Sequence, residues 1–330
     1  MSIIVVTGAT GFIGRRVVPW LVAAGHQVRA IQRRHREPHP IPLTQWMTLG
    51  DSAEIGDWRV ALAGCDVVVN LAGLAHQPGR AGRGRLSEFM RVKIGGPRAL
   101  VRAMLERRRP MRLVLVSSVG AVASVSLTTL TTLTEAAESR PDTDYGRTML
   151  AGERGIAQFL TGSGVDRCVL RLPPGYGPGV PGNLARLSRP VQKGRPLPLG
   201  ALGANRSLVY VRNLVDAVAA CAASPSASRR TYFLADDEHP SLRELLVAIG
   251  QALGRPPNVW SVPLRVLRTS AALFEFASRA AGRSIGLARY ALERLLGSIT
   301  VDSMPMHREL CWRRPSTMES GFDATFANGT

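Results

Sequence analysis

The chain has 330 residues, enough for two domains of ordinary size or for one large α/β unit. Hydrophobic residues make up 45% of it, which supplies a sizeable core and excludes an intrinsically disordered protein. The net charge of +18 makes the chain strongly basic, whereas an aromatic content of only 5% argues against a protein that stacks on single-stranded nucleic acid.

The cysteines and the uncharged stretches predict a soluble protein of a reducing compartment. The four cysteines lie far apart and form no CxxC pair, so we expect free thiols rather than a disulfide framework or a zinc site. The chain opens directly into an apolar strand-like run, which is not the pattern of a signal peptide. The longest uncharged stretch, residues 113–134, is rich in Ser and Thr and would make a poor membrane span. We therefore expect a cytoplasmic protein without a transmembrane segment.

In the first half of the chain, short apolar runs alternate with helical patterns. Residues 11–24 predict a helix that ends at Gly25, and a second helix is expected near residues 88–109. The predicted strands lie at residues 3–6, 28–31, 67–71, 113–116 and 168–170. Continuous apolar strands separated by helices are typical of a parallel sheet covered on both faces. The fold class we expect is therefore α/β, with a doubly wound parallel sheet.

The second half of the chain differs in composition and in the length of its segments. Residues 173–179 read as a loop, and the segments after them are shorter and richer in Pro and Arg. We therefore predict a dinucleotide-binding domain over residues 1–172 and a smaller substrate lobe over residues 173–330, some of whose segments return to the first domain. Helices are expected at residues 242–253 and 287–296, and Ser241 with Glu244 three residues on predicts a capping box at the start of the first.

A glycine-rich segment follows the first strand and opens the first helix. It comprises Thr7, Gly8, Ala9, Thr10, Gly11, Phe12, Ile13 and Gly14. In such a segment Gly8 permits the tight turn, Gly11 lets a pyrophosphate approach the backbone, and Gly14 lets the helix pack close to the sheet. The helix start then offers free N–H groups and a positive dipole end to the phosphates. This arrangement predicts a dinucleotide site rather than a merely tight turn.

The end of the second strand indicates which dinucleotide is bound. An acidic side chain there would bond the adenosine ribose of NAD, but the chain has Gln32 followed by Arg33. Arginine can pair with a 2′-phosphate, which favours NADP, although NAD stays possible. The alternative is a solvated basic loop in an arginine-rich chain. Asp51, just after the next expected strand, is a candidate contact on the adenine side.

Several segments of the chain form one set of motifs. They are the glycine-rich segment 7–14, residues 69–73, 117–118, 144–153, 171–179 and 206–217, and the tail segments 301–303 and 308–312. Together they resemble the extended short-chain dehydrogenase/reductases, the NAD-dependent epimerase/dehydratase family. The resemblance covers nearly the whole chain, and its nearest members are UDP-sugar 4-reductases and 4-epimerases of bacterial polysaccharide synthesis. It implies a Rossmann-type sheet with a smaller C-terminal substrate lobe.

By this resemblance, Tyr145 is the catalytic acid/base and Ser118 hydrogen-bonds the reacting oxygen. The chemistry is consistent with both roles, because hydride transfer at a sugar carbon requires one proton to move at the adjacent hydroxyl. The resemblance also assigns cofactor contacts beyond the glycine-rich segment to Leu71, Ala72, Gly73 and Pro173.

Two departures from the family pattern lie at the predicted active site. The family places a lysine four residues after the tyrosine, where it lowers the pKa of the phenol and holds the nicotinamide ribose; here that residue is Met149. The family also places an asparagine on the helix before the fifth strand, and here that residue is Lys93. Lys93 is therefore a candidate replacement for the missing ammonium group. The alternative is a surface lysine on an impaired paralogue.

On the substrate side, the resemblance implies a UDP-linked sugar. It assigns the diphosphate to Arg206 and to Asn183, and the uracil to the stretch around Leu197. Arginines at positions 80, 83 and 85 follow the fourth strand and can lie over the substrate. Val119 and Gly120 replace the Asp-Glu pair of 4,6-dehydratases, which makes dehydration an unfavoured reaction. The basic clusters carry no nucleic-acid-binding fold, so we expect no specific nucleic acid, and weak attraction to anionic membranes is compatible with the charge.

The sequence thus predicts an NAD(P)-dependent sugar-nucleotide oxidoreductase, in particular a reductase of the 4-keto group of a UDP-linked 6-deoxy N-acetylhexosamine. The rivals are a UDP-sugar 4-epimerase and a non-catalytic dinucleotide-binding paralogue, the latter motivated by Met149. We expect no metal, and a homodimer is possible.

Overall fold

The computed structural model describes residues 1–33, 41–42, 44–49, 55–72, 96–107, 109–123, 132–199, 203–280 and 297–327. Its centre is a seven-stranded sheet in which every pairing is parallel. The spatial order is β10-β7-β5-β4-β1-β2-β3. The strands are β1 (Ile3–Thr7), β2 (Gln27–Gln32), β3 (Thr44–Thr48), β4 (Val67–Asn70), β5 (Met111–Ser118), β7 (Val165–Leu172) and β10 (Thr231–Phe233). The doubly wound α/β architecture predicted from the sequence is confirmed.

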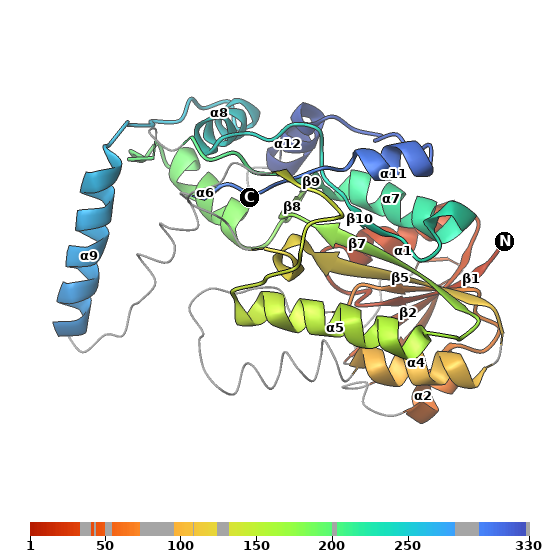
Figure 1. The fold of residues 1–330 in the computed structure, drawn as a ribbon. Helices are drawn as coiled ribbons and strands as arrows, with labels where there is room; N and C mark the ends of the chain where they lie inside the picture. The colour runs from red at the N-terminus through yellow and green to blue at the C-terminus, as the bar shows by residue number, and fades with distance from the viewer. Residues whose placement is uncertain are drawn as a thin grey trace.

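Helices cover both faces of the sheet (Figure 1). One face carries α1 (Gly14–Ala23), α7 (Val211–Ala223) and α11 (Met304–Glu309), and the other carries α2 (Ile55–Ala61), α4 (Gly96–Glu106) and α5 (Asp144–Leu160). Two apolar cores result. Leu21 of α1 and Leu214 of α7 belong to the first, and Leu100 of α4 and Ile156 of α5 to the second. Strands buried from both sides explain the continuous Ile and Val runs of β1 and β4.

A third core lies beyond the carboxyl ends of the strands. It is built by α6 (Asn183–Gln192), α8 (Leu242–Ala252), α12 (Met318–Phe326) and the two-stranded sheet of β8 (Gly175–Tyr176) and β9 (Val209–Tyr210). The predicted capping box starts α8, since Ser241 Oγ accepts from Glu244 N and the Glu244 carboxylate accepts from Ser241 N. Helix α9 (Leu264–Ala280) extends away from this core (Figure 1).

Smaller elements connect these parts. They are β6 (Thr132–Leu133) paired with β11 (Thr300–Val301), and the 3₁₀ turns η2 (Val119–Ala121) and η3 (Pro225–Ala227). Trp312 of the tail packs in the first core of the sheet. The division at residue 173 stays a prediction. The helix expected at residues 287–296, and the part of the helix near residues 88–109 that precedes Gly96, lie outside the described residues.

Candidate active site

The carboxyl ends of β1 and β4 form the centre of the candidate site. From β1 the chain proceeds outward to β2 and β3 and then returns to β4 on the other side, so β1 and β4 flank the topological switch point of the sheet. Open α/β sheets bind ligands in the crevice at that point. Thr7 Oγ1 donates to Asn70 Oδ1 at 2.6 Å and accepts from Ala72 N at 3.1 Å. These bonds hold the ends of the two strands together under the crevice.

The glycine-rich segment is pressed against this edge. Gly8 has a φ of 66°, and a Cβ built on it would lie 2.9 Å from both Leu71 C and Ala72 N. A Cβ on Gly14 would overlap Gly8 O and the Ala9 backbone, whereas one on Gly11 would approach only Gly8 O, at 3.1 Å. Gly8 and Gly14 therefore close the turn, and Gly11 stays exposed beside the start of α1, which has no side-chain cap.

Two arginines of α1 join this segment to the loop that follows β7. Arg16 Nη1 donates to Phe12 O at 2.8 Å and its guanidinium lies 4.6 Å from the Phe12 ring centroid, while Nη2 donates to Pro178 O. Arg15 Nη2 donates to Gly179 O at 3.3 Å. Burial lowers the pKa of Arg16 from its usual value. The sequence analysis missed this link, although the Arg pair directly after Gly14 was its available signal.

The other predicted contacts of this region lie as follows. Thr10 is exposed, and Phe12, Ile13, Leu71 and Ala72 are half-buried around the switch point. Gly73 and Asp51 lie outside the described residues, so nothing is added to their predicted roles.

The end of β2 presents an amide whose hydrogen bonds are incomplete. Gln32 is buried, its Nε2 donates to Thr48 Oγ1 at 3.1 Å, and its Oε1 is buried with no donor in the described part of the chain. Arg33, next to it, is exposed. The Thr48 hydroxyl can donate or accept, so the Gln32 amide can turn either its oxygen or its NH₂ group away from Thr48. A ribose hydroxyl could then donate to the oxygen, or a phosphate could accept from the NH₂ group. Together with the open backbone at Gly11, these groups fit a dinucleotide.

Ser118 and the ring of Tyr145 both lie close to Gly120. Ser118 ends β5, and its Oγ accepts from Gly120 N at 3.1 Å. A Cβ built on Gly120 would lie 3.4 Å from Ser118 Oγ and 3.5 Å from Tyr145 Cε1. A hydroxyl and an aromatic ring from positions 27 residues apart thus both lie beside the turn that follows β5.

Another glycine fixes the start of α5 against this turn. A Cβ on Gly146 would lie 2.9 Å from Pro141 Cβ and 3.1 Å from Thr143 Oγ1, and closer still to Gly120 O. Thr143 caps the helix by accepting from Gly146 N at 3.0 Å. Gly146 therefore sets the distance between the helix that carries Tyr145 and the turn that follows Ser118. Sequence reasoning missed this role, since only the tertiary contact makes the glycine necessary.

Met149 is buried, with 6% of its surface exposed, in a small apolar cluster with Ala121, Leu150 and the half-buried Tyr145. Arg147, the nearest cation along α5, is exposed and pairs with Asp144 at 3.3 Å. The position of the family lysine is thus filled by an apolar side chain packed beside the tyrosine. Lys93 lies outside the described residues.

One turn beyond Met149 along α5, Glu153 forms a buried ion pair close to Ser117, the neighbour of Ser118. Arg171 of β7 donates to the Glu153 carboxylate, with Nη2 to Oε2 at 2.7 Å, and Ser117 Oγ donates to Glu153 Oε1. Both charged side chains are largely buried. This pair ties α5 to the ends of β5 and β7, and it was not found from the sequence.

The predicted substrate residues lie in the segments around the third core. Pro173 is buried directly after β7, Asn183 is the first residue of α6, and Leu197 is buried and bridges to Val259. Arg206 is half-buried and bridges to Ile299. The arginines at positions 80, 83 and 85 lie outside the described residues.

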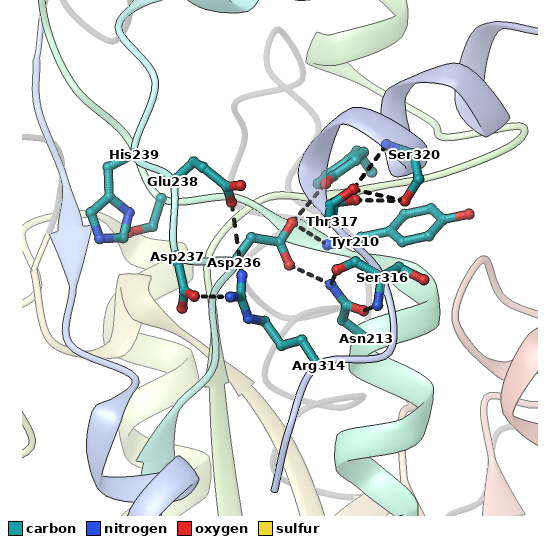
Figure 2. Close-up of polar contacts among 12 residues, drawn as sticks. Tyr210, Asn213, Asp236, Asp237, Glu238, His239, Arg314, Ser316, Thr317 and Ser320 are labelled. Carbon is teal, nitrogen blue, oxygen red and sulfur yellow. Dashed lines mark hydrogen bonds and ion pairs between the residues drawn. The ribbon is translucent and has the colours of Figure 1, made fainter.

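A buried carboxylate connects the loop after β7, α7 and the tail (Figure 2). Asp236 accepts from Tyr176 Oη at 2.7 Å, from Tyr210 N at 3.0 Å and from Asn213 Nδ2 at 2.8 Å. Asn213 also exchanges two hydrogen bonds with the backbone of Ser316, each of 3.0 Å. Burial raises the pKa of Asp236 from its usual value. The network fixes Tyr176, and hence residues 173–179, relative to the substrate side.

Two features are absent from the described residues. No group of three or more His, Cys, Asp or Glu side chains there could hold a metal ion. No helix there combines the length and the apolar character needed to cross a bilayer.

Comparison with known proteins identifies the family. The fold is of the Rossmann type. The model of the NAD dependent epimerase/dehydratase family matches residues 4–235, and the chain belongs to that family. It is therefore related to NAD-dependent oxidoreductases and epimerases, as the motifs indicated.

Three relatives illustrate the similarity. UDP-glucose 4-epimerase of Vibrio cholerae is 28% identical over 98% of this chain and 94% of its own length. N-acetyl-α-D-glucosaminyl-diphospho-ditrans,octacis-undecaprenol 4-epimerase of Escherichia coli O157:H7 is 21% identical over 98% and 93%. The crystal structure of Thermus thermophilus UDP-glucose 4-epimerase in complex with NAD superposes with a TM-score of 0.73 at 20% identity, covering 99% of this chain and all of that one.

Proposed function

We propose that this chain is an NADP-preferring reductase of the 4-keto group of a UDP-linked 6-deoxy N-acetylhexosamine. The observation that carries the proposal is the placement of the Ser118 hydroxyl and the Tyr145 ring beside the same residue, Gly120. The pair lies at the carboxyl end of a sheet whose neighbouring switch point fits a dinucleotide. A phenol and a hydroxyl in such a crevice are the groups that carbonyl reduction requires.

In this proposal each residue of the pair has one role. Ser118 donates a hydrogen bond to the carbonyl oxygen of the sugar and orients it, and Tyr145 donates the proton that the oxygen takes up. When bound, the nicotinamide supplies the hydride. Gly8, Gly11 and the start of α1 hold the pyrophosphate, with Thr10, Phe12, Ile13 and Gly14 around it, and Leu71, Ala72, Gly73 and Pro173 line the cofactor side.

The preference for NADP rests on the end of β2. Gln32 and Arg33 place no carboxylate there, and the exposed Arg33 side chain is suited to pair with a 2′-phosphate. Titration of the purified protein with NAD and with NADP tests this assignment. Tenfold tighter binding of NAD, about 1.4 kcal/mol, would contradict it. Arg33→Asp is expected to move the preference towards NAD.

Met149 cannot supply Tyr145 with the neighbouring cation that would lower the pKa of its phenol. A phenol has a pKa near ~10, and a nearby cation would lower it, whereas a buried thioether does not. We propose that Lys93 supplies this cation and acts as the third catalytic residue. Lys93→Ala is then expected to reduce turnover by ~10²–10⁴ at unchanged fold. An unchanged rate in that variant would refute the replacement.

On the substrate side, Arg206 and Asn183 are proposed to bind the diphosphate, and Leu197 to lie along the uracil. The names of the Vibrio cholerae and Escherichia coli relatives support a diphosphate-linked sugar, since one acts on UDP-glucose and the other on a diphospho-undecaprenol-linked N-acetylglucosamine. Arg206→Gln is expected to raise KM for the UDP-sugar with little effect on NADP binding.

A 4-epimerase is the second candidate, because both relatives are epimerases by name. The same residues serve both reactions, but an epimerase keeps its cofactor and returns the hydride to the other face of the sugar. Mass spectrometry of the ligand that co-purifies with the protein separates the two. Retained NAD and turnover of a UDP-4-hydroxy sugar without added cofactor indicate the epimerase, whereas oxidation of added NADPH by a UDP-4-keto sugar indicates the reductase.

A non-catalytic dinucleotide-binding protein is the third candidate, favoured by the apolar packing of Met149 beside Tyr145. It predicts cofactor binding without turnover of any 4-keto or 4-hydroxy sugar nucleotide. The decisive variant is Met149→Lys, which is expected to gain activity only if the rest of the site is intact.

A further inference from the structure

Helix α9 carries exposed apolar side chains along one side. Val266 is 52% exposed, Leu273 69% and Phe276 73%. At 100° per residue, their spacings of seven and three place them within about 80° of one another around the helix. At the first turn of the helix, Leu267 is buried in the core formed with α6, α8 and α12. Beyond that turn the helix extends away from the molecule (Figure 1).

Basic and aromatic side chains adjoin this stripe. Arg265 and Arg268 are exposed, and by the same spacing they lie about 20° and 80° beyond Phe276 around the helix, on one flank of the stripe. Trp260, four residues before the helix, is 61% exposed. Its position is fixed, because its backbone N donates to Leu197 O at 2.9 Å and its indole N–H donates to Asn258 Oδ1 at 2.7 Å. An apolar stripe with flanking arginines and an exposed tryptophan is typical of a helix that lies in a membrane interface.

The charge of the whole protein indicates what covers the stripe. At a net charge of +18, a second copy would be repelled, whereas an anionic surface attracts the protein. A helix of 17 residues is about 25 Å long, and no described helix is apolar enough to cross a bilayer. We propose that α9, together with Trp260, docks the protein on an anionic phospholipid bilayer, with the helix lying in the plane of the interface. This inference does not depend on the reaction proposed above.

Docking through α9 would set the orientation of the substrate lobe. The Trp260 backbone is hydrogen-bonded to Leu197, and Val259 forms a β-bridge with the same residue. Trp260, the proposed membrane contact, is therefore adjacent to Leu197, the proposed uracil contact. The substrate lobe would then face the bilayer, and the sheet would lie on its far side.

The test is co-sedimentation of the full chain with vesicles of phosphatidylglycerol and phosphatidylcholine. We expect binding to the mixed vesicles, weaker binding in high salt, and little binding to pure phosphatidylcholine. Leu273→Ser/Phe276→Ser is expected to weaken binding at least tenfold. Arg265→Gln/Arg268→Gln should weaken it about 25-fold, since each arginine near an anionic surface contributes about 1 kcal/mol, or roughly fivefold.

Matched controls remove similar groups elsewhere. Val60→Ser deletes an apolar side chain that is 65% exposed on α2, and Arg102→Gln/Arg154→Gln removes two exposed arginines from α4 and α5. Both controls should bind within twofold of the wild type. Cofactor binding and the thermal unfolding midpoint show whether each variant is folded. Brominated lipid should quench the fluorescence of the wild type and not that of Trp260→Phe.

Three results would overturn the proposal. They are no binding of the wild type to anionic vesicles, equal losses in the α9 variants and in the controls, and a dimer in gel filtration that Leu273→Ser/Phe276→Ser converts to a monomer without any vesicle binding by the wild type. The last result would assign the stripe to a second copy of the chain.

Discussion

The contact between Gly146 and Gly120 allows the geometry of the site to be tested with one substitution, which adds a single methyl group. Gly146→Ala adds a Cβ that overlaps Gly120 O and lies 2.9 Å from Pro141 Cβ. None of these atoms is the end of a flexible side chain, so α5 or the turn after Ser118 must move. Overpacking of this kind costs typically ~1–3 kcal/mol. Alanine in place of glycine in a helix returns up to ~1 kcal/mol.

Gly155→Ala is the matched control on the same helix. A Cβ on Gly155 meets nothing within 4 Å, so this variant gains the helix propensity of alanine without a clash. In urea unfolding we expect Gly155→Ala to be more stable than the wild type by up to ~1 kcal/mol and Gly146→Ala to be less stable by ~1–2 kcal/mol. The difference between the two variants isolates the cost of the contact.

The same pair of variants tests the site as well as the fold. Because Gly146 adjoins Tyr145, Gly146→Ala is expected to reduce turnover, or to weaken substrate binding measured in the presence of cofactor. Gly155→Ala should leave both unchanged. Equal stabilisation by the two alanines would show that α5 does not press on the turn after Ser118, and the reasoning about the Ser118–Tyr145 pair would lose its basis.

Three further outcomes are expected. Gly8→Ala should abolish dinucleotide binding measured by calorimetry, because its Cβ would meet the backbone of Ala72, while Gly25→Ala, at a φ of 83° in open space, should be only mildly destabilised and still bind. Glu153→Gln should lower the free energy of unfolding in urea by ~3–5 kcal/mol, since it leaves the buried guanidinium of Arg171 without its anion; a loss below ~1 kcal/mol would contradict this. Burial, with a smaller contribution from nearby Glu309, raises the pKa of Glu135 to about 7, so its contribution to stability is fully present below its usual pKa and is lost as the pH rises through about 7. Glu135→Gln should flatten the dependence of stability on pH between about 4.5 and 7, and an unchanged slope would refute the assignment.

The sequence predicted the parts of the fold that depend on local patterns. Continuous Ile and Val runs located β1 and β4, the glycine spacing located the turn between β1 and α1, and Ser241 with Glu244 located the start of α8. Each of these signals is contained in fewer than ten neighbouring residues. The parallel order of the sheet followed from the alternation of strands and helices.

The remaining parts required the folded chain. Glu153 and Arg171 lie in two separate motif segments, and only the packing of α5 against β7 makes them a buried ion pair. Asp236 acquires its role from Tyr176 and from the tail, which are distant along the chain. The motif showed only that Met149 replaces the family lysine, whereas the structure shows that its side chain packs beside Tyr145. Side chains whose function depends on contacts between distant segments leave no periodic signal.

The central claim is that Tyr145, opposite Ser118, moves the proton in reduction at C4 of a UDP-linked sugar. The most direct measurement is the rate of NADPH oxidation with a UDP-linked 4-keto-6-deoxy N-acetylhexosamine, in the wild type and in Met149→Lys, each with and without Tyr145→Phe. We expect turnover in the wild type, a faster rate or an unchanged one in Met149→Lys, and a loss of ~10²–10⁴ on Tyr145→Phe in either background. A rate that survives Tyr145→Phe, or a protein that binds NADPH and is inert in both backgrounds, would contradict the account.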